Sequence, residues 1–415
     1  MRIPSRLPNA FSRLLLCLFS AVQVLPILAA EEPPDAATIV RRLKSNQESV
    51  RKSAVPLVEW QKGHDEEYLT ALDDLIAGTL KRPVLDSHLM AVEKLTDCPL
   101  PGGIEAVAQA LDAFDWRLVM TAVEVLGKKK ADSQAANIAK VWARPDAQRY
   151  YALRHAVVIS LGDIGKPKAT EALVQLLPAL EGQLKYEAVA RLTLRTGQNH
   201  GDSPDAWKDW WSGQQGVMPT VTVEENEALP EDLPWAYPVP KFFARPIYSQ
   251  RVVFVLDRSG SMKSTLNGQT RLAAMQEQFQ QAIQRLPESA SFGLIVFNER
   301  VEVWRSPLVR ANAVNKAAAI QSIYSLQAAG LTAIYDALEK GLQLDQNIEQ
   351  IIFLTDGRPT AGKYTRTDDI VTAIAQMNRY LHTRIDCLGI DTEGEPEELL
   401  KEISRQTYGT YTRIR

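Results

Sequence analysis

An acid and two serines follow directly on an apolar run in the second half of the chain. Residues 251–256 form the run, and Asp257, Ser259 and Ser261 come next. Such a run predicts a buried parallel strand, which ends at the carboxyl edge of an open α/β sheet, where ligands bind in these folds. Gly260 allows the backbone to curl so that the three side chains converge. Hard oxygen ligands on one loop indicate a site for a small divalent cation.

Two later segments supply further oxygen ligands. Thr332 follows a Gly-Leu pair, and Asp356 follows a second apolar run. Mg²⁺ takes near-octahedral oxygen ligands and is bound by one or two carboxylates. Asp257 and Asp356 supply at most two negative charges, so the ion would remain electrophilic toward one more anion. The alternative is that Ser259 and Ser261 cap the following helix and that Asp356 is a turn residue.

This pattern resembles the metal-ion-dependent adhesion site of von Willebrand factor type A (VWA) domains. The resemblance rests on Asp-x-Ser-x-Ser at 257–261, Gly-Leu-Thr at 330–332 and Thr-Asp-Gly at 355–357. It implies that the first-loop acid and serines bind the ion together with Thr332, and that Asp356 acts through water. It also implies that a protein partner completes the octahedron with an Asp or Glu carboxylate. Mg²⁺ is favoured as the ion, with Mn²⁺ or Ca²⁺ as alternatives.

The resemblance implies a non-enzymatic, metal-dependent protein-binding module for adhesion or scaffolding. A second hypothesis assigns recognition to the amino-terminal half and makes the VWA half a scaffold. A third, metal-assisted hydrolysis, requires the ion to activate water. It also requires a general base that the sequence does not reveal. Residues 357–363 have the spacing of a phosphate-binding loop, but Tyr364 replaces the magnesium-binding Ser or Thr and Pro359 removes an amide, so nucleotide binding is not expected.

Length and composition predict a multidomain globular protein, and the first thirty residues predict that it is exported. The chain has 415 residues, of which 45% are hydrophobic and 23% charged, with a formal net charge of −3. Residues 1–30 place three arginines before an apolar stretch and end in Ala29 and Ala30, which predicts a secretory signal peptide. The family resemblance is to VWA proteins of the bacterial exported type. The protein would be periplasmic or extracellular, and would meet a membrane only if this segment stayed uncleaved as an anchor. The mildly acidic balance predicts no nucleic-acid partner.

Residues 31–213 show helical periodicity and internal repetition. Gly127, Gly162 and Gly197 recur at intervals of 35 residues, and each is predicted to follow or end a helix. The segment around Gly162 is similar to a HEAT-type repeat, with Pro167 near the start of the next helix. Periods of this length indicate stacked helix pairs, so this half is predicted to be a short α-solenoid.

The remaining segments are a linker and the VWA half. Residues 214–248 are rich in proline and aromatic residues, and the aromatic side chains are expected to fold back onto a neighbouring domain. Residues 249–415 alternate strand and helix patterns, which predicts a doubly wound, Rossmann-like parallel sheet with residues 408–414 as an edge strand.

Three further groups of residues are assigned structural roles. Trp207, Trp210 and Trp211 lie at one-turn spacing and are predicted to close the end of the helical core. Cys98 and Cys387 are expected to be buried free thiols. The five histidines show no metal-ligand spacing and are predicted to be surface or satisfied core residues.

Overall fold

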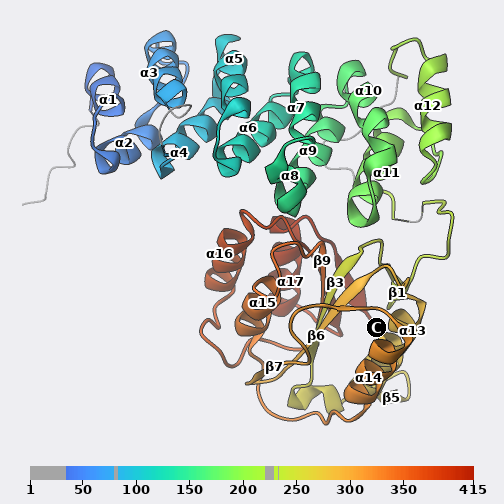
Figure 1. Ribbon diagram of the computed structural model, residues 1–415. Coiled ribbons are helices and arrows are strands. Elements are labelled where there is room, and N and C mark those ends of the chain that lie inside the picture. Colours follow the sequence, from blue (N-terminus) through green and yellow to red (C-terminus); the bar gives the residue numbers. More distant parts are fainter. Residues whose placement is uncertain (1–33, 79–82, 220–228, 232) are drawn as a thin grey trace, which may run out of the picture.

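A computed structural model describes residues 34–78, 83–219, 229–231 and 233–415. The signal peptide predicted for residues 1–30 lies outside these residues. A helical half is followed by a half built on a β-sheet, which lies beneath α8 and α11 (Figure 1). Within the described part of the chain, no helix is both long and apolar enough to cross a membrane.

The helical half is a row of short helices, each packed against its neighbours (Figure 1). Its α-helices are α1 (Ala36–Leu43), α2 (Glu48–Ala54), α3 (Asp65–Ala77), α4 (Asp86–Lys94), α5 (Gly102–Gln109), α6 (Trp116–Lys128), α7 (Ala135–Val141), α8 (Pro145–Arg149), α9 (Tyr151–Ile164), α10 (Pro167–Leu176), α11 (Gly182–Thr196) and α12 (Pro204–Gly213). A continuous cluster of buried apolar side chains runs from Ile39 to Trp211. Each helix pair therefore completes its core against the next pair.

Two of the equally spaced glycines lie inside helices, which corrects the prediction that each follows or ends one. Gly127 lies in α6 and Gly162 in α9, whereas Gly197 ends α11 in a left-handed conformation. A Cβ atom at Gly162 would lie 2.3 Å from Cδ of Arg191, and one at Gly127 would lie 2.7 Å from Cβ of Ser160. The interval therefore marks the points where α6, α9 and α11 approach one another closely. Pro167 is the first residue of α10, as predicted.

The second half contains a mostly parallel sheet. Its strands are β3 (Arg251–Asp257), β6 (Ser291–Phe297), β7 (Val301–Val303), β8 (Val309–Arg310), β9 (Gln350–Thr355), β10 (Arg384–Ile390) and β11 (Tyr411–Ile414). Their order is β11-β10-β9-β3-β6-β7, with β8 also pairing with β6. Strands β3, β6, β9, β10 and β11 are parallel, which confirms the predicted fold class and places β11 at an edge. The antiparallel pairing of β7 and β8 with β6 was not predicted.

Helices cover both faces of this sheet. They are α13 (Arg271–Arg285), α14 (Ala313–Tyr324), α15 (Ile334–Leu342), α16 (Thr367–Asn378) and α17 (Glu395–Gln406). Val252, Phe254 and Leu256 of β3 pack with α13 and α14, whereas Val253 and Val255 pack with α15, α16 and α17. Because successive side chains of a strand point to opposite faces, burial on both faces requires the continuous apolar run seen in the sequence. Short hairpins are formed by β1 (Lys241–Phe242) with β2 (Arg245–Pro246), and by β4 (Thr265–Leu266) with β5 (Gln269–Thr270).

The predicted linker packs against both halves. Tyr248 stacks on Tyr186 of α11 with ring centroids 4.3 Å apart, and Trp235 packs beside it. Phe242 is buried in the core of the sheet half. Trp207 and Trp211 are buried at the end of the helical core, as predicted. Cys98 and Cys387 are buried free thiols, which also confirms their prediction.

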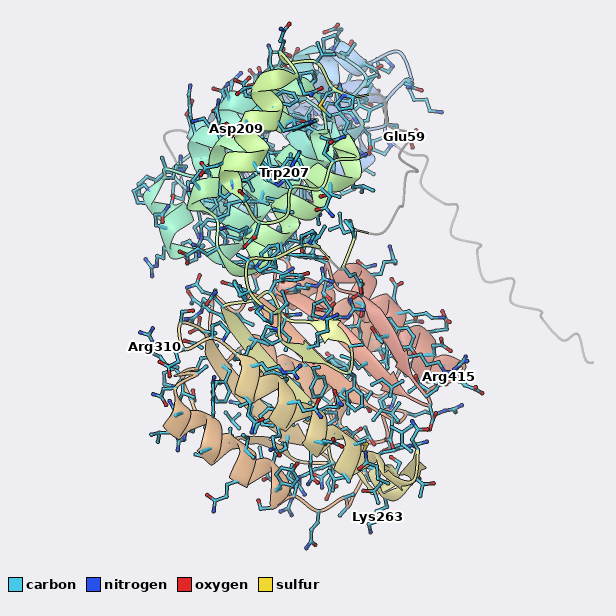
Figure 2. All side chains as sticks on the ribbon, turned by 90° about the vertical axis from the view of Figure 1, so that its right-hand side faces the viewer. Glu59, Trp207, Asp209, Lys263, Arg310 and Arg415 are labelled. Carbon is cyan, nitrogen blue, oxygen red and sulfur yellow. The ribbon has the colours of Figure 1, made fainter. Side chains whose placement is uncertain are left out.

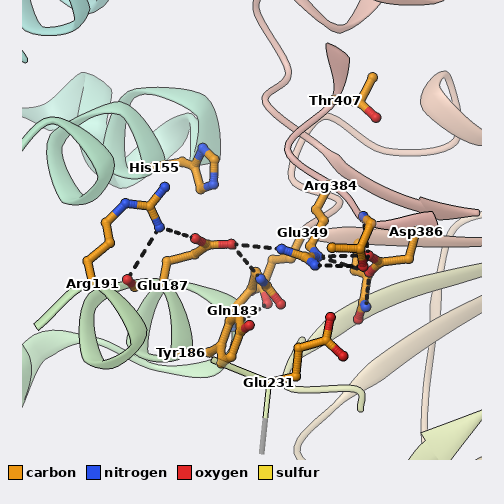
Figure 3. A network of polar contacts seen from close by, with 12 residues as sticks. His155, Gln183, Tyr186, Glu187, Arg191, Glu231, Glu349, Arg384, Asp386 and Thr407 are labelled. Carbon is orange, nitrogen blue, oxygen red and sulfur yellow. Dashed lines mark hydrogen bonds and ion pairs between the residues drawn. The ribbon is translucent and has the colours of Figure 1, made fainter. Parts of the chain in front are cut away.

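The helical half contacts the amino-terminal ends of the central strands. Arg384, the first residue of β10, pairs with Glu187 of α11 at 3.3 Å and with Asp386 at 2.9 Å (Figure 3). Glu349, directly before β9, accepts a hydrogen bond from the amide of Gln183 at 3.3 Å. The carboxyl ends of the parallel strands therefore point away from the helical half.

A second group of contacts at this junction contains two histidines. Nδ1 of His155 in α9 lies 3.2 Å from Nδ1 of His382, whose Nε2 lies 2.8 Å from Glu124 of α6. His155 is fully buried, and its Nε2 has no hydrogen-bond partner among the described residues, so the prediction of a surface or satisfied histidine is wrong here. Burial and the neighbouring His382 and Arg191 hold the pKa of His155 well below its usual value. The ring is therefore neutral at pH 7.

Candidate metal centre

The five predicted ligands lie on three loops at the carboxyl edge of the sheet. They are Asp257, Ser259, Ser261, Thr332 and Asp356. The first three are at or after the end of β3, the last follows β9, and the threonine precedes α15. Because β3 and β9 are adjacent and parallel, their ends open at the same edge. Lys263, which ends the short helix η7 (Gly260–Lys263), lies at the end of the molecule far from the helical half (Figure 2).

Hydrogen bonds join four of these residues. The amide of Ser259 donates to Oδ1 of Asp257 at 2.6 Å, and the hydroxyl oxygens of Ser259 and Ser261 are 3.0 Å apart. The hydroxyl of Ser261 donates to Oδ1 of Asp356 at 2.6 Å. One chain of contacts therefore links the β3 loop to the β9 loop.

Thr332 approaches the same cluster beside Gly357. A Cβ atom at Gly357 would lie 3.7 Å from both Oγ of Ser261 and Oγ1 of Thr332, so the two hydroxyls border one backbone position. The loop before Thr332 is fixed to the β3 loop, because the amide of Gly260 donates to the carbonyl of Gly330 at 3.0 Å. Gly330 has a φ of 83°, a left-handed conformation that favours glycine. Thr332 itself is buried.

The buried carboxyl of Asp257 lacks a full counter-charge. Burial raises its pKa to about 6, and the nearby charge of Asp356 adds to this effect. Hydrogen bonds from Oγ1 of Thr355, at 2.5 Å, and from Ser259 act in the opposite direction. A pKa raised by burial means that the ionised form is insufficiently stabilised, and an adjacent cation would stabilise it. This electrostatic state fits a cation site.

Arg271 also belongs to the site, although the sequence analysis missed it. It is the first residue of α13, and its Nη1 pairs with Oδ2 of Asp356 at 2.8 Å while Nη2 pairs with Asp391 at 2.9 Å. Burial disfavours the charged guanidinium, but its hydrogen bonds with the two acids outweigh burial and raise its pKa. A base at the amino end of a helix opposes the helix dipole, which was the available signal for a special role. Because Arg271 binds Oδ2 of Asp356, the other carboxylate oxygen, Oδ1, accepts the hydrogen bond from Ser261.

The donor set fits a hard divalent cation. Two carboxylates and three hydroxyls are oxygen ligands of the kind that Mg²⁺ prefers, whereas Zn²⁺ prefers nitrogen and sulfur. Among the described residues, including those of this site, no group of three or more His, Cys, Asp or Glu side chains is placed to hold a metal ion. A metal at this edge therefore depends on Ser259, Ser261 and Thr332. When bound, it would supply an electrophilic position for a further oxygen ligand.

Residues 250–413 match the family model of the von Willebrand factor type A domain. This segment is a VWA-type domain. The match spans the sheet and all of the helices that cover it, and it covers less than half of the chain. The helical half lies outside the matched residues.

Curated relatives share part of this sequence. The human inter-alpha-trypsin inhibitor heavy chain H4 is 36% identical over 125 residues, which cover 28% of this chain and 13% of the relative. The human heavy chain H2 is 29% identical over 178 residues, which cover 40% of this chain and 18% of the relative. The chain thus spans less than a fifth of the length of these relatives.

Solved structures with the same type of domain are also similar to part of the chain. A von Willebrand factor type A protein from Catenulispora acidiphila is 27% identical, with a TM-score of 0.36, and the match covers 41% of this chain and 40% of that one. Proximal thread matrix protein 1 from the mussel byssus, in a structure described as having a zinc-occupied MIDAS motif, is 20% identical. Its TM-score is 0.31, with 39% of this chain and 40% of that one covered.

Proposed function

We propose that the VWA-type domain binds a divalent cation, preferably Mg²⁺, and through it a carboxylate of a protein partner. The proposed ligands are Asp257, Ser259, Ser261, Thr332 and Asp356. The observation that carries this proposal is the convergence of these oxygens from three loops on one edge of the sheet, with Asp257 buried and incompletely neutralised. A Glu or Asp side chain of the partner would complete the coordination of the ion.

The position of the site supports binding of a macromolecule. The helical half covers the amino edge of the sheet, so the carboxyl edge is open to solvent around Ser261, which is exposed. The resemblance of residues 250–413 to VWA domains, which implies a protein-binding module, supports the same role. We therefore assign this chain a non-enzymatic role in adhesion or scaffolding, in an exported protein of the periplasm or the cell exterior.

A second candidate function places recognition between the two halves. A groove of about 670 Å³ lies between α6, α9 and the VWA-type domain, and Ser160, Asp163, Arg379, His382 and Tyr408 are among its lining residues. In this alternative the metal edge would be structural. Partner binding would then survive substitution of Asp257 and be lost on substitutions in the groove.

A metal-assisted hydrolase is the weakest candidate. Such an enzyme needs a general base within hydrogen-bond reach of the reacting water. The carboxylates of the site are engaged by Ser259, Ser261, Thr355 and Arg271. These contacts hold the carboxylates in place as metal ligands. None of them involves a histidine that could act as the general base.

Titration calorimetry with Mg²⁺ on chelator-treated protein tests the proposed metal site. The native protein should bind one ion, and Asp257→Asn or Thr332→Val should weaken binding by about ten-fold or more, because each removes a ligand. Asp368→Asn is a matched control, since this acid is exposed in the first turn of α16. Absence of binding by the native protein, or equal binding by all variants, would reject the proposed ligands. Parallel titrations with Mn²⁺ and Ca²⁺ establish the preferred ion.

A further inference from the structure

The loop that carries Thr332 continues a surface segment without charge. Residues 317–331, here called the neutral strip, contain no Asp, Glu, Lys or Arg, although 23% of the chain is charged. The strip begins within α14 and runs through a loop to the residue before Thr332. Several charged residues would be expected in a surface segment of this length.

The neutral strip is not simply part of the core. Ala319 and Ile323 pack inward, but Gln321, Tyr324 and Leu331 are exposed, the last two at 49% and 53%. Protein interfaces are depleted of charged residues at their centre and enriched in aromatic residues. The absence of charge and the exposed Tyr324 and Leu331 are the features that the strip shares with contact surfaces, whereas its alanines and serines are not.

The strip is held in place beside the metal centre. The amide of Leu331 donates to Oε2 of Glu299 at 2.9 Å, and the carbonyl of Gly330 accepts from Gly260 of the metal loop. Midway along the strip, the hydroxyl of Tyr324 donates to Gln280 of α13 at 2.8 Å. A surface held at its middle and at one end loses little conformational freedom there when a partner binds.

We propose that the neutral strip binds apolar side chains that flank the metal-binding acid of the partner. This inference rests on the proposed function, because Leu331 directly precedes the proposed ligand Thr332. A partner carboxylate on the ion would place its neighbouring residues over Leu331, and a longer segment would continue toward Tyr324. The partner is thus a protein segment in which one Asp or Glu is flanked by apolar residues.

Exposed cations on the other loops favour a different segment. Lys263 and Arg300 are exposed, and Arg358 lies 3.9 Å from Glu395 in a solvent-exposed pair. If these cations governed recognition, a segment with several consecutive acids would bind best. Exposed charges are screened by salt and contribute little individually, whereas Leu331 adjoins the metal centre directly.

Three labelled pentapeptides with blocked termini separate these possibilities. Each has a central Glu, flanked on both sides by Leu, by Ser or by Glu, and binding to the full chain is measured by fluorescence polarisation in Mg²⁺ and in chelator at equal ionic strength. The Leu-flanked peptide should bind in Mg²⁺ about ten-fold more tightly than the Ser-flanked one, since burial of a leucine side chain favours binding by about this factor. Leu331→Ser should abolish the preference. Val314→Ser is the matched control, because Val314 is 76% exposed on α14 outside the neutral strip.

The outcomes distinguish this inference from the proposed function. Binding that needs Mg²⁺ but is equal for Leu and Ser flanks, or is unchanged by Leu331→Ser, overturns the role of the strip alone. Tightest binding of the Glu-flanked peptide also overturns it, in favour of the exposed cations. Binding that persists in chelator overturns the proposed metal function, and absence of binding by every peptide to the Mg²⁺-loaded protein overturns both. Calorimetry of Mg²⁺ binding shows in each variant that the metal centre is intact.

Discussion

Two fully buried aspartates at opposite edges of one sheet have pKa values shifted in opposite directions. At the amino edge, burial would raise the pKa of Asp386, but the paired Arg384 outweighs burial and lowers it. At the carboxyl edge, burial raises the pKa of Asp257 to about 6, and the nearby Asp356 adds to the rise. The comparison teaches that burial alone does not mark a ligand site. The distinguishing feature of the carboxyl edge is a buried acid that the protein does not neutralise and that lies beside further oxygen ligands from other loops.

The difference follows from what packs against each edge. The helical half contributes Glu187 to the amino edge, and Arg384 lies between it and Asp386, so that buried charges alternate in sign (Figure 3). At the carboxyl edge, Arg271 pairs with Asp356 and Asp391 rather than with Asp257, whose pKa burial raises. The network of Glu187, Arg384 and Asp386 balances its own charges, whereas the carboxyl edge would be stabilised by a further positive charge. Glu349 at the amino edge is also a buried acid whose pKa is raised, but the backbone amides of Gln183 and Gln250 hold its carboxylate.

The largest expected effect is on the amino edge. Asp386→Asn removes a negative charge from beside the buried Arg384, and loss of one partner of a buried ion pair costs about 3 kcal/mol. Equilibrium unfolding in urea should show this loss. Glu402→Gln, at an exposed pair with Arg405, should change stability by about 0.5 kcal/mol or less. Equal effects of the two substitutions would contradict the assignment of Asp386 to a closed network.

The same chemical change at the carboxyl edge should behave differently. Asp257→Asn removes a charge that burial already disfavours, so unfolding without metal should change by about 1 kcal/mol or less. The stabilisation by Mg²⁺ should disappear in this variant. In the native protein it should reach about 2.7 kcal/mol at an ion concentration 100 times the dissociation constant. Thermal melts with Mg²⁺ and with chelator measure both quantities, and a large loss of stability without metal would remove the contrast between the edges.

The sequence predicted the parallel strands of the sheet and the residues of the candidate site because both leave local signals. Apolar runs followed by Asp or Ser marked β3 and β9, and their parallel pairing brought the loops together. Arg271 was missed because its partners Asp356 and Asp391 come from two other loops. Its position at the first turn of α13 was the only local sign.

The amino edge could not be predicted for a similar reason. Glu187 and Arg384 are 197 residues apart in the chain, and nothing in either segment indicates the other. Periodicity predicted the helices but misread Gly162, because a glycine at a close crossing of helices has the same spacing as one at a helix end. Helix α17 was also missed, although Pro396 and the acidic first turn are typical of a helix start.

The smallest expected effect concerns acid sensitivity of the amino edge. His155 is neutral in the folded protein because its pKa is held well below 6.5, whereas the unfolded chain binds a proton near pH 6.5. The unfolded state therefore binds more protons below this pH, and stability falls as the pH drops. The contribution of His155 at pH 5.5 is about 1 kcal/mol, and it vanishes above pH 7.

His155→Phe should make the pH dependence between 7 and 5.5 shallower by that amount. The ring stacks on Tyr151 and lies edge-on to His382 and Tyr408, so an aromatic replacement retains the packing while removing the titration. His64→Gln, at a half-exposed position outside the junction, is the control. Urea unfolding at several pH values measures the slopes. His155→Phe and the native protein could instead lose stability in parallel as the pH falls. His155 would then take up its proton in the folded state. That result would contradict the contrast between a sealed amino edge and an open carboxyl edge.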